Sequence, residues 1–250
     1  ESFFSKEASL LMEMSHRGLP KVIDYFTENE KNYLIMERIE GLTFEEIVEK
    51  QGPFSAKELL PWAIQLCEVL TYLHTREPPV IFRDMKPSNI MLNIDGTVRL
   101  IDFGIARFYE PQKIKDTTPL GTPGYSPPEQ YGRGQTSPAS DIYSLGATMY
   151  FLLTGKDPVD FKFKFPPLET FNQKISPSFN NIVMQCLELN PSDRFQSAAH
   201  LESVLREWKE EKPRWYEDFV DLLVNLFTSE KVPEPVRQIA TKVTRPLKKS

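Results

Sequence analysis

The side chains that could do chemistry together lie in three short runs: Phe82–Asn89 (FRDMKPSN), Asp102–Gly104 (DFG) and Gly121–Glu129 (GTPGYSPPE). Asp84, Asn89 and Asp102 offer carboxylate or amide oxygens, which are the hard ligands that Mg²⁺ prefers. A carboxylate such as that of Asp84 can also accept a proton, and the Lys86 ammonium can neutralise an anion. Each of these residues alone is more often a surface salt bridge or a turn cap. The inference therefore depends on all three runs occurring in one chain.

The order and spacing of the runs resemble those of protein kinases, in which they form the catalytic loop, the metal-binding DFG and the APE-type end of the activation segment. The spacing D-x4-N is kept at Asp84 and Asn89, and the DFG begins 13 residues after Asn89. The resemblance implies an α+β, kinase-like fold with a small β-rich N-lobe and a mainly helical C-lobe. It also implies ATP and Mg²⁺ as cofactors.

The resemblance assigns roles to five polar residues. Asp84 would accept the proton of the substrate hydroxyl, and Lys86 would neutralise charge on the transferring phosphate. Asn89 and Asp102 would hold Mg²⁺, while Thr122 would brace Asp84 and Lys86. Phosphoryl transfer depends mainly on such positioning and electrostatic stabilisation. Because D-x-K-P-x-N marks the Ser/Thr branch of the family, and GTPGYSPPE resembles a peptide-binding platform, we expect protein substrates with Ser or Thr acceptors.

Further positions resemble residues around the family's nucleotide: Glu7 as the helix αC glutamate, Met36, Glu37 and Ile39 as gatekeeper and hinge, and Met91 beneath the base. Other positions resemble structural residues of the family. Asp141 matches the aspartate that anchors the catalytic loop, with its carboxylate accepting from buried backbone N–H groups. Arg194 matches the partner of Glu129.

The catalytic and activation segments also depart from the family's usual pattern. Phe82 replaces the usual His, so we expect it to keep an aromatic contact with Phe103 and to lose one hydrogen bond. SPPE replaces APE, which resembles a bacterial-type kinase. Arg83 precedes Asp84, so a phosphate on Thr117 or Thr118 could pair with it and order the loop. The alternative, which is favoured to the same degree, is that both threonines are ordinary polar residues of a loop.

The nucleotide end shows a larger departure. The chain contains no G-x-G-x-x-G, and no strand-borne Lys precedes Glu7. We therefore expect these 250 residues to be an incomplete catalytic domain that begins within a longer protein and hardly turns over. The alternative is a catalytically inert, kinase-like binding or scaffold module. The first interpretation is favoured because a lone hairpin is marginally stable and because Asp84, Asn89 and Asp102 are all present.

Periodicity predicts the elements that must position these residues. Helical patterns cover residues 2–15, 44–50, 56–74 and most of 140–208, and a hairpin is predicted from 21–26 and 32–38. Short strands are predicted across residues 80–107 with a turn at Asn93–Gly96, followed by a Pro- and Gly-rich loop at 109–138. We expect a partial N-lobe at 1–38, a C-lobe at 39–208 and a separate segment at 209–250.

Composition excludes several function classes. The net charge of −5 argues against a nucleic-acid partner, and 40% hydrophobic residues argue against disorder. Cys67 and Cys186 favour a reducing compartment, so we expect a cytoplasmic protein. The 14-residue apolar run 142–155 is too short for a transmembrane segment and predicts a buried helix. Residues 209–250 pair an apolar helical pattern with a basic end, which predicts a helix and linker, or a contact with a partner or membrane surface.

Overall fold

The computed structural model of the chain describes residues 11–29, 31–102, 107–108, 121–131 and 135–209. The chain divides into two units, Glu1–Trp208 and Lys209–Ser250, and the described helices and strands belong to the first. The predicted division of this first unit at residue 38 stays a prediction.

All strand pairs of the described residues are antiparallel. Strands β1 (Val22–Glu28) and β2 (Lys31–Met36) form a two-stranded sheet. A second sheet has the order β3-β5-β6, with β3 at Gly41–Thr43, β5 at Ile90–Asn93 and β6 at Val98–Leu100. Strands β4 (Val80–Ile81) and β7 (Arg107–Phe108) form a third sheet. The predicted turn between β5 and β6 is confirmed. This turn requires a residue with a left-handed backbone, and Gly96 provides it with a φ of +81°.

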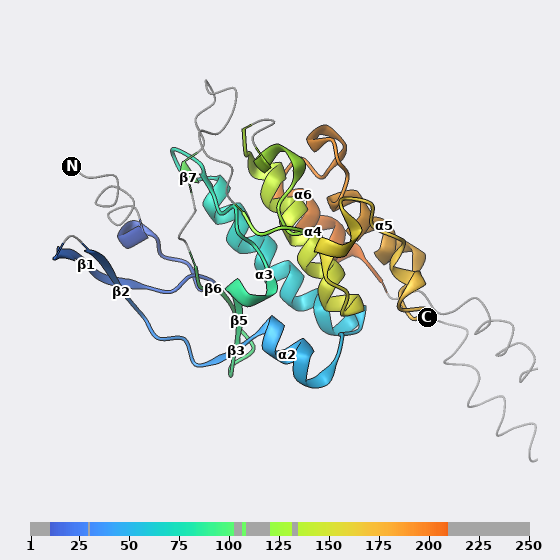
Figure 1. The fold of residues 1–250 in the computed structure, drawn as a ribbon, viewed down its shortest axis with the longest axis horizontal. Helices are drawn as coiled ribbons and strands as arrows, with labels where there is room; N and C mark the ends of the chain where they lie inside the picture. Colours follow the sequence, from blue (N-terminus) through green and yellow to red (C-terminus); the bar gives the residue numbers. More distant parts are fainter. Residues whose placement is uncertain (1–10, 30, 103–106, 109–120, 132–134, 210–250) are drawn as a thin grey trace, which may run out of the picture. The chain divides into compact units, whose positions relative to one another are not determined.

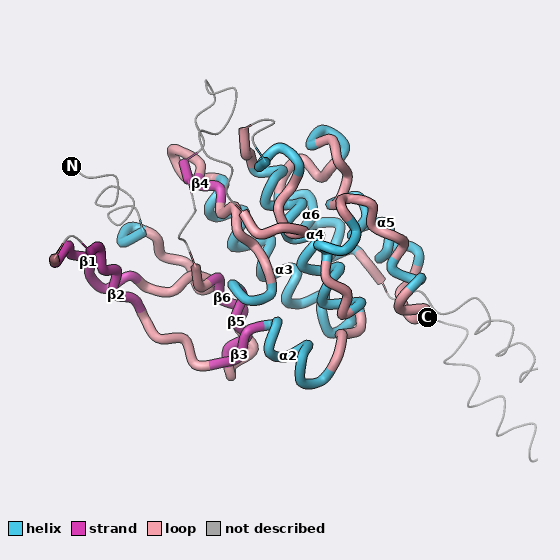
Figure 2. The backbone as a smooth tube through the Cα atoms, in the orientation of Figure 1, coloured by secondary structure: helices cyan, strands magenta, loops and turns pink. Residues whose placement is uncertain are grey.

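Residues 11–13 are helical, and further α-helices are α2 (Phe44–Gln51), α3 (Ala56–His74), α4 (Pro138–Thr154), α5 (Pro177–Cys186) and α6 (Ala198–Glu207). Short 3₁₀ turns lie between them: η1 (Pro87–Asn89), η2 (Pro128–Tyr131), η3 (Pro158–Phe161), η4 (Leu168–Thr170) and η5 (Pro191–Asp193). Together with the small antiparallel sheets, these helices make a mixed α+β fold (Figures 1 and 2). The predicted fold class is confirmed.

Local sequence explains where α2 and α3 begin. Thr43 and Ser55 are the N-caps, and each side chain accepts a hydrogen bond from the backbone of the glutamate three residues later. In turn, the carboxylates of Glu46 and Glu58 accept from the backbone N–H groups of the cap residues, which completes a capping box at each helix.

Helix α4 is the centre of the helical core and packs against α3 and α5. Nearly all of its residues are buried, so the buried helix predicted for residues 142–155 is confirmed. Among the described residues no helix combines the length and apolarity needed to cross a bilayer. Cys67 in α3 and Cys186 in α5 are both buried free thiols.

The mostly helical pattern expected over residues 140–208 is only partly right. Between α4 and α5 the chain forms 3₁₀ turns and irregular backbone rather than α-helix. Pro158, Pro166 and Pro167 lack the N–H groups that an α-helix needs there. In this stretch Phe161 and Phe165 pack against the Tyr150 ring, with ring centroids 5.4 Å and 5.0 Å from that of Tyr150.

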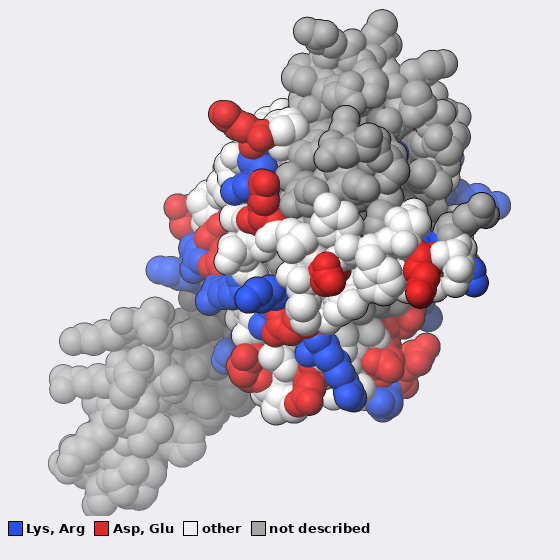
Figure 3. All heavy atoms as spheres, turned by 90° about the vertical axis from the view of Figure 1, so that its left-hand side faces the viewer, with Lys and Arg blue, Asp and Glu red and all other residues white. Residues whose placement is uncertain are grey.

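Basic and acidic side chains are interspersed on the face shown in Figure 3, where Lys and Arg residues alternate with Asp and Glu residues.

Candidate active site

Asp84, Lys86 and Thr122 form a closed set of hydrogen bonds. The Lys86 ammonium lies 3.0 Å from Asp84 Oδ2 and donates to Thr122 Oγ1 over 2.8 Å. The Thr122 hydroxyl donates to Asp84 Oδ1 over 2.7 Å. Residues 84 and 86 come from the loop before η1, and residue 122 comes from a segment 38 positions away from Asp84. The structure thus brings these three predicted residues together.

Asn89 lies against the same carboxylate. Its Nδ2 donates to Asp84 Oδ2 over 2.8 Å and to the Asp84 backbone carbonyl over 2.9 Å. These bonds use the amide nitrogen, so the amide oxygen of Asn89 is left for another partner. Asn89 closes η1, which begins at Pro87, where the missing N–H is not needed.

Asp102 follows β6 beside the same turn. The β5–β6 register pairs Ile90 with Leu100, and the Ile101 N–H donates to the Asn89 carbonyl over 3.0 Å. Asp102, the third predicted oxygen donor, is the next residue and therefore follows a backbone position that is bound to Asn89.

The donor set fits Mg²⁺ in a particular way. Within the described part of the chain no three His, Cys, Asp or Glu side chains form a metal-binding cluster. Mg²⁺ commonly takes only one or two carboxylates and completes its octahedron with waters and phosphate oxygens. The Asp102 carboxylate and the free amide oxygen of Asn89 are donors of this kind.

Asp141 holds the backbone of the loop that precedes Asp84. This fully buried carboxylate accepts from the backbone N–H of Phe82 and of Arg83, each over 2.8 Å. The His74 Nε2–H donates to Asp141 Oδ2 over 2.8 Å. Sequence reasoning missed His74, whose only signal is a histidine at the end of the apolar helix α3. Its partner lies 67 residues away, so spacing alone cannot find the pair.

Arg83 has an unusual backbone. Its φ of +70° is left-handed, which is rare for a residue with a long side chain. Its N–H is bound by Asp141, and its carbonyl accepts from Gln130 Nε2 over 2.8 Å. The turn into Asp84 is therefore held from both sides, and Gln130 is a second residue that sequence reasoning missed.

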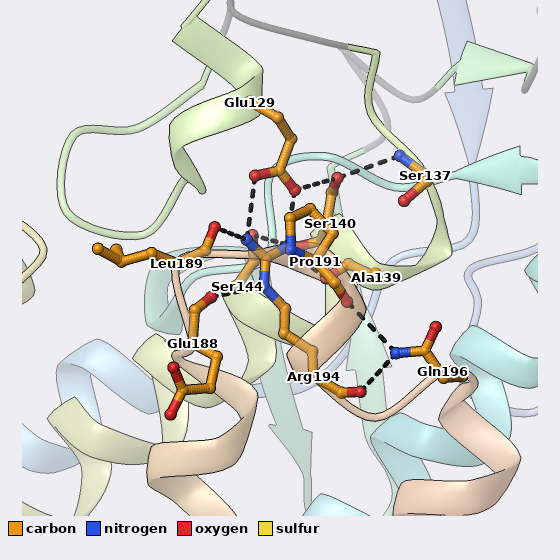
Figure 4. Close-up of polar contacts among 10 residues, drawn as sticks. All are labelled: Glu129, Ser137, Ala139, Ser140, Ser144, Glu188, Leu189, Pro191, Arg194 and Gln196. Carbon is orange, nitrogen blue, oxygen red and sulfur yellow. Dashed lines mark hydrogen bonds and ion pairs between the residues drawn. The ribbon is translucent and has the colours of Figure 1, made fainter.

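Glu129 and Arg194 form a largely buried, two-point ion pair (Figure 4). The two guanidinium nitrogens lie 2.7 and 3.0 Å from the two carboxylate oxygens. Arg194 also donates to the carbonyls of Ala139, Glu188 and Leu189. The Ser140 hydroxyl donates to Glu129 Oε1 over 2.8 Å, a contact that sequence reasoning did not foresee. This cluster joins η2, the start of α4 and the segment after α5.

Gly124 lets the segment between Thr122 and Glu129 pack closely. Its φ is +87°, and a Cβ there would lie 2.4 Å from the backbone nitrogen of Val159. Only glycine fits this approach without a backbone shift. Tyr125, the next residue, packs against the core, and burial raises the pKa of its hydroxyl, with the Asp157 charge adding to the shift.

Comparison with known proteins identifies the family. Residues 2–205 match the protein kinase domain family. The chain belongs to this family.

Its relatives include bacterial serine/threonine kinases. The chain is 35% identical over 216 residues to serine/threonine-protein kinase C of Synechocystis, covering 81% of this chain and 40% of that protein. It is 30% identical over 210 residues to the probable serine/threonine-protein kinase CPE1738 of Clostridium perfringens, covering 79% of this chain and 30% of that protein. It is 29% identical over 215 residues to PrkC of Bacillus subtilis, covering 81% and 33%. The chain thus spans about a third of the length of these curated relatives.

The gatekeeper and hinge expected at Met36–Ile39 begin at the last residue of β2. The Glu37 N–H donates to the Lys21 carbonyl over 2.8 Å, so this amide is already used and cannot also bind a base. The Glu37 side chain accepts from Arg99 of β6 over 3.4 Å. Met36 and Ile39 are half-buried. Met91 lies on the central strand β5, between Thr43 and Arg99.

Several expected kinase residues lie outside the described residues: Glu7, Phe103, Thr117 and Thr118. Their predicted roles, including the Phe82–Phe103 contact and the phosphate partner of Arg83, stay predictions. Phe82 itself is fully buried in the core, and Arg83 is 2% exposed.

Proposed function

We propose that this protein transfers the γ-phosphoryl group of ATP to Ser and Thr hydroxyls of protein substrates, with Asp84 accepting the hydroxyl proton. The observation that carries the proposal is the Asp84 carboxylate, which Lys86, Asn89 and Thr122 hold together. A carboxylate fixed by three donors is oriented before the substrate arrives, and such preorganisation is a large part of catalysis.

Lys86 has a second role in this proposal. An ammonium has three N–H donors, and two of them bind Asp84 and Thr122. The third is available for an oxygen of the transferring phosphate. Because Lys86 also contacts the proposed base, the positive charge lies where negative charge develops during transfer.

Asn89 and Asp102 would hold Mg²⁺, which when bound neutralises charge on the phosphate oxygens. The Asn89 amide group would bind Asp84 through its nitrogen and the cation through its oxygen. It would therefore keep the base and the cation in one fixed arrangement. Asp141 and Gln130 support this arrangement from beneath by fixing the Phe82–Arg83 backbone.

A second candidate is a catalytically inert, kinase-like binding module. The lack of a G-x-G-x-x-G in these 250 residues favours it, because backbone donors around the phosphates would be missing. Loss of one such stabilising donor costs about 2.7–4 kcal/mol of transition-state stabilisation. If the kinase proposal holds, we therefore expect the 250-residue chain to turn over slowly, through the residues around Asp84.

The test is transfer of radiolabelled phosphate from ATP to casein by the chain, at high enzyme concentration and with excess Mg²⁺. We expect a slow signal that Asp84→Asn lowers at least about 100-fold, while Lys174→Ala, an exposed lysine elsewhere, leaves it unchanged. Equal rates for the wild type and Asp84→Asn would refute the proposal and favour the inert module.

Two finer proposals accompany this function. The two buried thiols are compatible with a cytoplasmic site of action. Residues 209–250 would contact a protein partner or a membrane surface, as their basic end suggests. Unchanged localisation and partner recovery after deletion of these residues would remove the second of these proposals.

A further inference from the structure

A cavity of about 460 Å³ lies between three segments that are far apart in the sequence. Its lining residues are Pro128 and Tyr131 of η2, Lys162, Phe163 and Lys164 after η3, and Leu189 after α5. None of these residues belongs to the set around Asp84. The cavity is therefore a feature that the proposed chemistry does not use.

The wall of the cavity is held in place. The Tyr131 and Phe163 rings meet edge to face, with centroids 5.9 Å apart and an interplanar angle of 82°. Lys162 and Phe163 both have left-handed backbones, with φ of +49° and +68°. Two consecutive non-glycine residues rarely adopt this conformation, so the surrounding structure must impose it.

That imposed conformation has a simple cause. Phe161 and Phe165, which flank the strained pair, both pack edge-on against the buried Tyr150 ring. The chain between them must turn sharply, and the turn presents Phe163 to Tyr131 instead of to Tyr150. The cavity wall is thus formed without an occupant.

The chemistry of the cavity is apolar with a cationic rim. Leu189 is 52% exposed and Tyr131 is 41% exposed, and because both line the same cavity they form a joint apolar patch. Lys162 and Lys164 are exposed, and neither makes an ion pair with any residue that the structure describes. An apolar side chain flanked by carboxylates would complement both features.

The position of the cavity connects it to the proposed active site. Turn η2, which supplies Pro128 and Tyr131, also carries Gln130, and Gln130 donates to the carbonyl of Arg83, the residue before Asp84. A polypeptide bound in the cavity would therefore rest on the same turn that supports the catalytic loop.

We propose that this cavity is a docking site for protein substrates that carry an aromatic or leucine side chain flanked by acidic residues, apart from the phosphorylated Ser or Thr. The identification of the occupant as a substrate rests on the proposed kinase function. The apolar residue fills the cavity beside Tyr131 and Leu189, and the acidic neighbours pair with Lys162 and Lys164.

The first experiment measures binding without catalysis. A fluorescein-labelled peptide with one Phe between two pairs of Glu is titrated with the 250-residue chain by fluorescence polarisation. We expect the double substitution Lys162→Ala and Lys164→Ala to raise Kd about three- to tenfold, and Leu189→Ala to raise it by a similar factor. Raising the salt concentration should weaken wild-type binding, and Lys174→Ala should leave it unchanged.

Three outcomes would overturn the docking site. The first is that the peptide does not bind, and the second is that the Lys162/Lys164 variant binds it as tightly as the wild type. The third is that a peptide with Lys in place of Glu binds as tightly as the original peptide. Sedimentation of the chain provides a further check. A dimer that the Lys162/Lys164 variant loses would identify a second copy as the occupant and would overturn the substrate assignment.

A second experiment separates this proposal from the proposed function. The docking peptide is joined by a Gly-Ser linker to a Ser-containing acceptor, and transfer is compared with that to the acceptor alone. We expect the Lys162/Lys164 variant to raise KM for the linked substrate with kcat unchanged, and to leave the short acceptor unaffected. Peptide binding without any phosphate transfer would refute the kinase proposal. Transfer with the same Kd and the same KM for the wild type and the Lys162/Lys164 variant would refute the docking site.

Discussion

Helix α4 and the β1–β2 hairpin are both rich in apolar residues, yet opposite environments surround them. In α4 the side chains are buried on nearly every face. In the hairpin Ile23, Phe26, Tyr33 and Ile35 are between 40% and 58% exposed, and of its apolar residues only Val22 is buried. Burial of apolar area is the main stabilising contribution to folding. The helical core should therefore set the stability of the described unit, while the hairpin should open locally at a much lower cost.

The same contrast applies to the two groups of proposed functional residues. The loop that carries Asp84 and Asn89 is bound to α4, because Asp141 accepts from the backbone N–H groups of the two residues before Asp84. In contrast, Met36 ends the exposed hairpin and Glu37 follows it. Substitutions in α4 and its ion pairs should therefore disturb the catalytic loop, and substitutions in the hairpin should not.

The largest effect is expected from Arg194→Ala, which leaves the largely buried Glu129 without its charge partner. Breaking a buried ion pair from one side typically costs about 3–5 kcal/mol. Urea unfolding monitored by circular dichroism would measure the loss. Arg206→Ala removes an arginine from an exposed pair with Glu68 and Glu202 and is the matched control, for which we expect a far smaller shift of the midpoint. If Arg194→Ala does not fold, Glu129→Gln is measured in its place. Equal urea midpoints for the variant of the buried pair and for Arg206→Ala would contradict the expected difference between core and surface.

A smaller loss is expected from Gly146→Ala in the middle of α4. A Cβ at this position would lie 2.5 Å from the Cys186 Cβ, so α4 and α5 would have to move apart. Overpacking of this kind costs about 1–3 kcal/mol, partly offset by the better helix propensity of alanine. Thermal unfolding would measure it. The same substitution in a Cys186→Gly background should lose less, and an equal loss in both backgrounds would show that the α4–α5 contact is not the cause.

Ser55→Ala should destabilise α3 by about 0.5–2 kcal/mol, because Ser55 is its N-cap. The effect should also depend on pH. Hydrogen bonds from the Ser55 side chain and backbone hold the pKa of Glu58 below its usual range. A carboxyl whose pKa is lower in the folded state stabilises the fold above its unfolded pKa, and this contribution is lost as pH falls through the folded pKa.

The difference in melting temperature between the wild type and Ser55→Ala should therefore narrow from pH 7 towards pH 3. Thr43→Ala, at the equivalent cap of α2, should behave in the same way because Glu46 has the same kind of pKa shift. A difference that stays constant over this range would contradict the assignment.

The smallest effect is expected in the hairpin. Phe26 and Tyr33 are direct cross-strand partners whose rings stack with centroids 5.0 Å apart. Such pairs contribute about 0.2–1 kcal/mol. Phe26→Ala should speed amide hydrogen exchange in residues 22–36 and leave exchange in α4 unchanged. Faster exchange in α4 would mean that the two regions unfold together.

Local sequence determined most of the elements and the family. The capping residues at Ser55 and Thr43, the Asn93–Gly96 turn and the apolar run of α4 each act within a few positions of the chain. The kinase motifs are also contiguous, so the order of residues along the chain is enough to recognise Asp84, Asn89 and Asp102. The mostly helical pattern expected over residues 140–208 is interrupted between α4 and α5, where prolines and ring packing around Tyr150 favour 3₁₀ turns and irregular backbone.

Only the tertiary structure decided what brings these pieces together. His74 and Asp141 are 67 residues apart, and Gln130 and Arg83 are 47 apart, so no local pattern records that they meet. The cavity that we propose as a docking site likewise combines three distant segments and a strained turn. Hydrogen bonds and packing act over a few ångströms in space, whereas sequence patterns report only neighbours along the chain.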